Sequence, residues 1–168
     1  RGLRFLNLLT EQFENLYPAT QVVKSVRSLA VWHDKLWIGT NDEGLLYYDF
    51  QNGSILHLPL ESGKSKSIVY AFAPANGKLY IGSYDGLSCY DPTKQVRKTV
   101  SLPEQFRKLM VNSLLWDEQQ NCLWIGAEGC LLQYSFKDSH VETSLALPSN
   151  TAKTLAFDNK NNIVIGTD

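Results

Sequence analysis

The most constraining feature of the sequence is a short motif that returns about every 42 residues. Residues 36–39 read Leu-Trp-Ile-Gly, and apolar residues ending in the same glycine recur at 79–82, 123–126 and 163–166. The four glycines are spaced by 43, 44 and 40 residues. Repeats of about 40–45 residues with several short strands are typical of β-propeller blades. The sequence therefore predicts an all-β fold built from four blade-sized repeats of four strands each.

A second motif follows the first with the same period. Residues 44–49 read Gly-Leu-Leu-Tyr-Tyr-Asp and residues 86–91 read Gly-Leu-Ser-Cys-Tyr-Asp, with related segments at 2–7 and 130–135. Turn residues separate the expected strands. In the first full repeat we expect strands over 26–32, 35–40, 44–49 and 54–58. Residues 102–110 are expected to form a loop with at most one helical turn.

The repeats predict one β-propeller domain over residues 1–168. The predicted blades cover 24–65, 66–109 and 110–150, and a split blade combines 151–168 with 1–23. Two arrangements fit this division: the ends complete one blade and close a four-blade ring, or the chain is an excerpt of a larger propeller with half a blade at each end. Uncovered half blades would expose strand edges and apolar faces, so the second arrangement predicts self-association.

The apolar motif also predicts how the blades pack. A sheet covered on both faces carries continuous apolar runs, as in the Leu-Trp-Ile segments. Trp37 and Trp124 are therefore expected in the core between blades, where their rings supply a large contact area. Glycines 39, 82, 126 and 166 are expected where two backbones approach closely.

The pair of motifs, best seen in residues 35–49, resembles the two-component regulator propeller repeat, in four copies over essentially the whole chain. That family forms the extracytoplasmic sensor region of bacterial hybrid two-component systems. The resemblance implies a seven-bladed parent propeller, a ligand-sensing role directed at carbohydrate breakdown products such as oligosaccharides, and a periplasmic location. It also implies further sensor domains, a membrane span and a histidine kinase as downstream partners in the same polypeptide. The motif is structural and carries no catalytic residues.

Composition excludes several other classes of protein. The 16 Lys and Arg residues balance 17 Asp and Glu residues, which argues against a nucleic-acid partner. No apolar run reaches the ~18–20 residues of a membrane span. No spacing of histidines or cysteines typical of a metal site is present, so we expect no metal and no cofactor. The three cysteines, Cys89, Cys122 and Cys130, are too few for a disulfide framework, and we expect no bond between Cys122 and Cys130.

A candidate ligand-binding site comes from the loops that lead into the innermost strands. In a propeller these loops converge on the mouth of the central channel, and here they carry repeated basic residues. The predicted site residues are Lys24, Arg27, Lys66, Arg107, Lys108 and Lys153, with Lys64 beside them. We expect an electropositive mouth that favours an anionic ligand, such as an acidic oligosaccharide or an acidic protein surface. The alternative is that these are ordinary solvated loop charges.

Three functional classes are compatible with a propeller of this kind. The first is a sensor module without catalysis, which the repeat resemblance favours. The second is a protein-interaction platform, as in WD-repeat rings, although the motif here ends in Gly-Thr rather than Trp-Asp. The third is a propeller lyase or hydrolase, which would need histidines or carboxylates on the mouth loops. Those loops carry basic residues and no histidine, so we expect no enzyme activity.

Overall fold

The computed structural model describes residues 3–14, 23–62 and 67–168, and confirms the all-β prediction. The strands form antiparallel sheets that follow one another along the chain. The first complete sheet, here called blade 1, has the strand order of a simple meander. Its strands are β3 (Val26–Trp32), β4 (Lys35–Thr40), β5 (Leu45–Asp49) and β6 (Ser54–His57). The expected strands over 26–32 and 35–40 match β3 and β4 at both ends.

Blade 2 repeats the same four-stranded meander. Its strands are β7 (Val69–Ala75), β8 (Lys78–Ser83), β9 (Gly86–Asp91) and β10 (Val96–Thr99). The loop that follows holds a single 3-10 turn, η1 (Glu104–Phe106), as expected for residues 102–110. Among the described residues no helix has the length and apolar character of a membrane span.

Blade 3 consists of β11 (Val111–Asp117), β12 (Cys122–Ser135) and β13 (His140–Thr151). The amide nitrogen of Gln133 donates to Gln120 at 3.1 Å and lies 3.5 Å from Cys122 Sγ. An extended strand would separate residues 122 and 133 by roughly 36 Å, so β12 folds back on itself. The bend falls at the exposed pair Glu128 and Gly129, where Gly129 has a φ of 74°. Blade 3 therefore has the layout of four strands, with the second and third joined by a tight turn.

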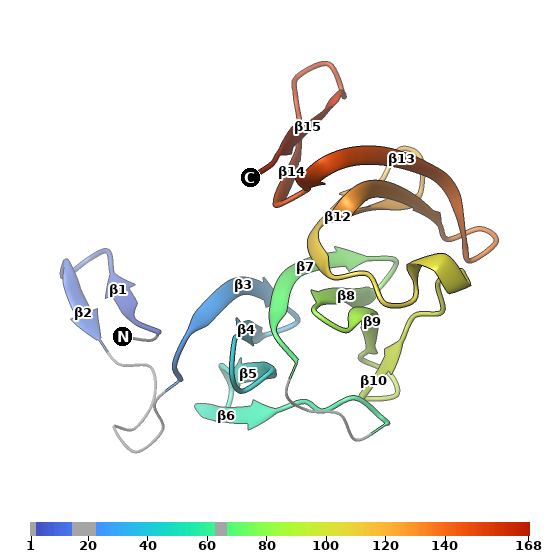
Figure 1. The fold of residues 1–168 in the computed structure, drawn as a ribbon. Helices are drawn as coiled ribbons and strands as arrows, with labels where there is room; N and C mark the ends of the chain where they lie inside the picture. The colour runs from blue at the N-terminus through green and yellow to red at the C-terminus, as the bar shows by residue number, and fades with distance from the viewer. Residues whose placement is uncertain (1–2, 15–22, 63–66) are drawn as a thin grey trace.

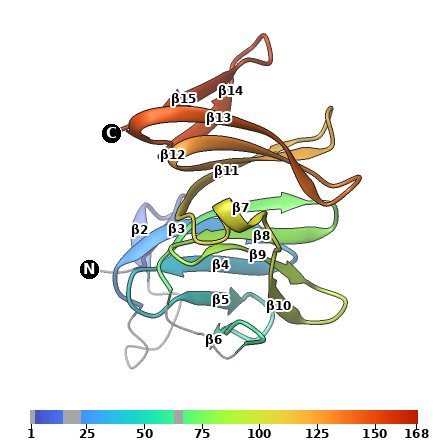
Figure 2. The ribbon, with the colours of Figure 1, turned by 45° about the vertical axis from the view of Figure 1, so that its right-hand side comes forward.

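A two-stranded hairpin lies at each end of the chain. The first pairs β1 (Phe5–Asn7) with β2 (Gln12–Glu14), and the last pairs β14 (Thr154–Phe157) with β15 (Ile163–Gly166). Figure 1 shows these hairpins at the two ends of an arc of sheets, and Figure 2 shows β14–β15 next to β13 of blade 3. No ladder joins the two hairpins in the described residues. The split blade of residues 151–168 and 1–23 stays a prediction. The repeat boundaries and the seven-bladed parent stay predictions.

The first three motif glycines lie where one blade meets the next, as expected, whereas at Gly166 the atoms nearest to an added Cβ all belong to Thr154 of its own hairpin. A Cβ added to each of the first three would lie 2.8 or 2.9 Å from a backbone carbonyl oxygen at the start of the following blade. The contacts join Gly39 to Val69, Gly82 to Val111 and Gly126 to Ala152. Since even a methyl group would overlap a backbone atom there, glycine is required for blades to pack this closely.

Aromatic side chains form the second contact between blades. Trp37 is fully buried, its ring centroid is 4.9 Å from that of Tyr90 in blade 2, and its indole N–H donates to the Trp32 carbonyl at 3.1 Å. The sequence predicts Trp124, at the same place in the motif, in the core as well, but Trp124 is only half-buried. Tyr90 belongs to a third strand, and the hairpin β14–β15 that follows blade 3 has no third strand.

Candidate functional site

The loops into the inner strands and the turns between second and third strands lie at the same edge of the blades. In blade 1 the backbone N–H of Asn41 donates to the carbonyl of Ser25 at 3.1 Å, and in blade 2 Tyr84 donates to Ile68 at 2.9 Å. We call this edge the loop edge. It includes residues 23–25, 41–44, 67–68, 84–85, 107–110, 128–129, 152–153 and 167–168.

Two buried hydroxyls fix the turns of this edge. Thr40 Oγ1 donates to the carbonyl of Gly44 at 2.9 Å, and Ser83 Oγ donates to the carbonyl of Gly86 at 3.0 Å. Both side chains are buried, so the bonds form away from competing water. The hydroxyl residue after each motif glycine therefore holds the next turn in place.

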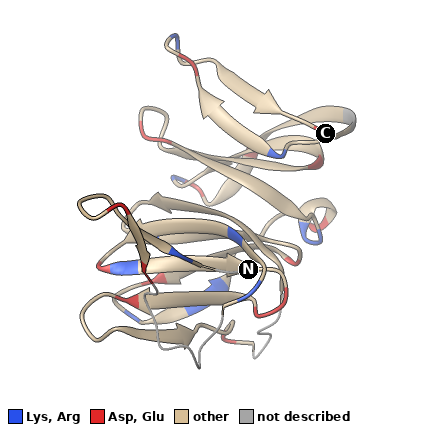
Figure 3. Cartoon of the chain, turned by 90° about the vertical axis from the view of Figure 1, so that its left-hand side faces the viewer, with Lys and Arg blue, Asp and Glu red and all other residues tan. Residues whose placement is uncertain are grey.

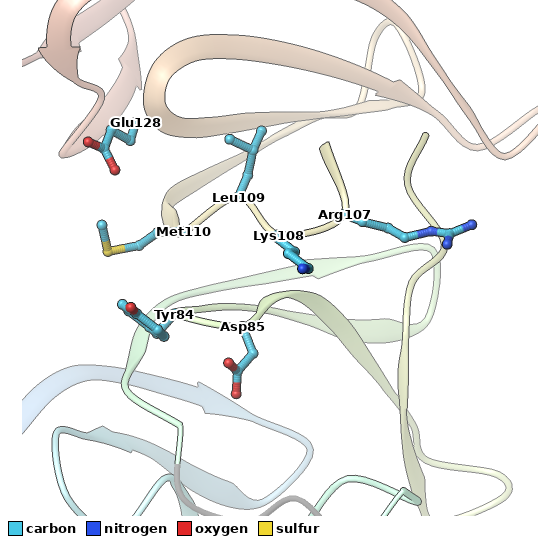
Figure 4. A pocket seen from close by; sticks show the side chains of 7 residues that line it. All are labelled: Tyr84, Asp85, Arg107, Lys108, Leu109, Met110 and Glu128. Carbon is cyan, nitrogen blue, oxygen red and sulfur yellow. The ribbon is translucent and has the colours of Figure 1, made fainter. Parts of the chain in front are cut away.

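A pocket of about 690 Å³ opens at the loop edge between blades 2 and 3. Its lining comes from the β8–β9 turn, the segment before β11 and the bend in β12. Figure 4 shows the lining residues, which are Tyr84, Asp85, Arg107, Lys108, Leu109, Met110 and Glu128. Gly86 adopts a φ of 108° at its base, and a Cβ there would lie 3.4 Å from the carbonyl oxygen of Arg107. The glycine thus lets the turn lie close under the segment leading into β11.

The pocket carries charges of both signs. Arg107 forms an ion pair with Glu104 at 2.7 Å, and in Figure 4 its side chain points away from the other labelled groups. Lys108 shares the pocket with the carboxylates of Asp85 and Glu128. The structure therefore offers one ammonium group, two carboxylates and an exposed aromatic ring, that of Tyr84, to a ligand.

A buried arginine interacts with one of the pocket's carboxylates, that of Asp85. Arg97 is almost fully buried, and its Nε donates to Ser88 Oγ at 3.0 Å. Burial lowers the pKa of Arg97 to about 10, and the nearby carboxylate of Asp85 opposes this shift. Asp85 therefore lines the pocket and also interacts electrostatically with a buried guanidinium.

The predicted basic residues do not converge on one place. Arg107 and Lys108 line the pocket, while Arg27 bonds to the Asn41 side chain and lies 5.8 Å from the Tyr70 ring centroid. Lys153 pairs with Asp168 at 3.4 Å, and Lys24 is exposed before β3. Figure 3 shows Lys and Arg interspersed with Asp and Glu. Two further predicted residues, Lys64 and Lys66, lie outside the described residues.

The sequence reasoning missed the partners of these basic residues. Tyr84, Asp85 and Glu128 follow the second strands directly, and these positions share an edge with the loops into the inner strands. A strand pair that turns back after the motif must place its turn at that edge. The position directly after each motif therefore predicts a residue at the loop edge, whatever the charge of its side chain.

The structure is similar to extracellular domains of bacterial signalling proteins. The extracellular domain of the putative hybrid two component system BT4673 from B. thetaiotaomicron matches 94% of this chain at 30% identity, with a TM-score of 0.82. The extracellular domain of the putative one component system BT4673 from B. thetaiotaomicron, a second solved structure, matches 94% of this chain at 29% identity, with a TM-score of 0.79. The resemblance inferred from the repeat motifs is thereby confirmed.

A third structure shows likeness of fold alone. It is the extracellular domain of the putative hybrid two component system BT3049 from B. thetaiotaomicron, at 21% identity over 99% of this chain and with a TM-score of 0.74. This chain spans 21–23% of the length of the three solved chains. No protein-family model and no curated protein matches the sequence.

Proposed function

We propose that this chain is part of a ligand-sensing propeller in the extracytoplasmic region of a bacterial hybrid two-component system, and that it performs no catalytic step. The observation that carries the proposal is its 30% identity over 94% of its length to such an extracellular domain. The proposed location is the periplasm. The proposed partners are further sensor domains and a histidine kinase in the same polypeptide.

The proposed ligand is an oligosaccharide released by polysaccharide breakdown, bound in the pocket between blades 2 and 3. Tyr84 offers an exposed ring face, and Asp85, Glu128 and Lys108 offer hydrogen-bonding groups of both kinds. One ammonium group and two carboxylates favour a neutral, hydroxyl-bearing ligand in this pocket over an anion. An anionic ligand at the basic residues of the whole loop edge stays the second proposal.

Calorimetric titration tests both proposals with defined probes. Neutral oligosaccharides from glucan, xylan, mannan and arabinan form one panel, and oligogalacturonides form the acidic panel. We expect a neutral probe to bind, and Tyr84→Ala or Asp85→Asn to weaken it roughly tenfold or more. Lys94→Gln is the matched control, because Lys94 is exposed in the β9–β10 turn, at the end of blade 2 away from the pocket.

Each outcome of the titration decides between the ligands. Binding of the acidic panel alone, weakened by Lys108→Gln and by added salt, would favour the anionic ligand. Binding that Lys94→Gln weakens as much as Tyr84→Ala does would place the ligand elsewhere. A failure of both panels would refute the pocket as an oligosaccharide site.

A further inference from the structure

The pocket between blades 2 and 3 carries more negative than positive charge. Arg107 pairs with Glu104 at 2.7 Å, so these two charges cancel. Lys108 then remains with the carboxylates of Asp85 and Glu128. All lining residues belong to blades 2 and 3 or to the segment between them, so the pocket lies away from both ends of the chain. For ligands of equal shape, such a pocket favours a cation over a neutral molecule.

The two carboxylates of the pocket differ in their surroundings. Asp85 interacts electrostatically with the buried guanidinium of Arg97. The Glu128 side chain is exposed, and in the described part of the chain its carboxylate forms no ion pair and accepts no hydrogen bond. Glu128 is therefore the negative charge of the pocket that no cation of the described chain offsets.

A thioether and an aromatic ring lie on the same side of the pocket as this carboxylate. Val111 pairs with Ala127 across the β11–β12 ladder. The residues just beyond that pair, Met110 and Glu128, therefore lie opposite each other at the loop edge. Figure 4 shows these two side chains and that of Tyr84 together on one side of the view. We call Tyr84, Met110 and Glu128 the ring side of the pocket.

The close packing of the β8–β9 turn fixes the place of Tyr84. A Cβ added to Gly82 would lie 2.9 Å from the carbonyl oxygen of Val111. A Cβ added to Gly86 would lie 3.4 Å from the carbonyl oxygen of Arg107. Tyr84 is midway between these two glycines, so it lies beside the segment that leads into β11. Its side chain is 57% exposed, which leaves ring surface open to a ligand.

The groups of the ring side are suited to an ammonium group. An ionised carboxylate such as that of Glu128 accepts charge-assisted N–H bonds, which are roughly twice as strong as bonds between neutral groups. The face of the Tyr84 ring attracts a cation that lies within about 6 Å of the ring centroid. A hydroxyl group in the same place would gain a hydrogen bond without this added attraction. Lys108 repels an ammonium group and so directs it to the ring side.

We propose that the ring side binds the protonated amine of an amino sugar within the oligosaccharide ligand. This inference rests on the proposed function and narrows its ligand to oligosaccharides with amine-bearing units. The Glu128 carboxylate accepts the N–H bonds of the ammonium group, and the Tyr84 ring lies against the same sugar unit. Lys108 faces the hydroxyl groups of the neighbouring unit. An N-acetylated sugar lacks the positive charge and gains less from Glu128.

Calorimetric titration with two matched probes tests this assignment. The glucosamine tetramer carries a free amine on each unit, and in the N-acetylglucosamine tetramer each amine is converted to a neutral amide. We expect the wild type to bind the glucosamine tetramer about tenfold more tightly or better. Added salt should reduce this preference, because salt screens the attraction between the charges.

Two matched substitutions assign the preference to one carboxylate. Glu128→Gln keeps the size of the side chain and removes its charge, so the two tetramers should then bind with nearly equal affinity. Glu118→Gln is the control and should keep the wild-type preference. Glu118 is an exposed carboxylate of the same blade, in the β11–β12 turn at the end away from the pocket.

A third variant separates the loss of charge from damage to the pocket. Lys108→Gln removes the repulsion of the amine, so the preference for the glucosamine tetramer should stay or rise. A damaged pocket would lower the preference in both variants, and that result would overturn the assignment to Glu128. Circular dichroism verifies that each variant keeps its strands.

The outcomes distinguish this assignment from the proposed function. Equal affinities of the wild type for the two tetramers, or a preference that persists in Glu128→Gln, would overturn the amino sugar and leave the oligosaccharide site standing. Putrescine, a diamine without a sugar, should bind far more weakly than the glucosamine tetramer; equal affinity would overturn the assignment to a sugar. If no oligosaccharide of any panel binds, the proposed function fails together with this inference.

Discussion

Replacing Gly82 by alanine tests the contact that sets the distance between blades. The added methyl carbon would lie 2.7 Å from Val111 Cγ1 and 2.9 Å from the Val111 carbonyl oxygen. Ordinary contacts between such atoms are ~3.5–4.0 Å. The Val111 side chain can rotate, but its carbonyl belongs to the backbone of β11, so blades 2 and 3 must move apart. Overpacking of this kind costs about 1–3 kcal/mol.

The structure supplies a matched control for this substitution. Gly166→Ala changes the same place in the motif, but its methyl group would meet only the Thr154 side chain at 2.5 Å, with the Thr154 carbonyl oxygen at 3.9 Å. A threonine side chain can change its rotamer, at a cost of about 1 kcal/mol or less. We therefore expect Gly82→Ala to lower the unfolding midpoint much more than Gly166→Ala.

The assay is urea unfolding monitored by tryptophan fluorescence, and thermal melting is measured in parallel. For a chain of this size, the cost at Gly82 corresponds to a fall in Tm of roughly 2–12 °C. The double variant Gly82→Ala with Val111→Ala should lose less stability than the sum of the two single variants, since the shorter side chain relieves part of the overlap. Equal losses at Gly82 and Gly166, or a Gly82→Ala variant as stable as the wild type, would refute the reasoning.

Three further predictions follow from the same contacts. Trp37→Ala removes a fully buried ring and should cost about 3–5 kcal/mol in urea unfolding, whereas Trp124→Ala, at a half-buried site, should cost clearly less. Ser113→Ala removes the 2.7 Å bond from Ser113 Oγ to the Ala152 carbonyl of the next hairpin and should cost about 1–3 kcal/mol, measured by the same unfolding midpoint. Burial raises the pKa of Tyr80 well above its usual 10. The protonated ring therefore contributes its full share of stability below pH 10, and this share is lost as the pH rises through the raised pKa. Between pH 8 and 11 the Tm should fall more steeply for the wild type than for Tyr80→Phe.

The period of the motif was enough to predict most of the fold. Each repeat folds as a local meander, so strand positions follow from turn residues such as the Asn76 and Gly77 pair, both of positive φ. The glycine contacts were also predictable, since a residue without a side chain inside an apolar run indicates close backbone approach. The order of the strands required no long-range information.

What the sequence did not predict depends on neighbours. Trp124 has the same motif as Trp37, but its burial depends on a third strand that follows in the next blade. The sequence predicts a positive surface at the basic loops, because the carboxylates of Asp85 and Glu128 lie in other segments of the chain. Only the folded arrangement places them beside Lys108 in one pocket. A charge pattern along the chain does not report which opposite charges the fold brings beside it.

The most direct test of the functional account is a map of the ligand on the protein. Two-dimensional ¹H–¹⁵N NMR spectra are recorded while the neutral oligosaccharide panel is added. The account predicts shifts confined to the amides of residues 84–86, 107–110 and 128–129, which surround the pocket between blades 2 and 3. The account would be contradicted by shifts restricted to the β5–β6 and β9–β10 turns, which lie at the end of the blades opposite the pocket. A spectrum that no probe changes would contradict it as well.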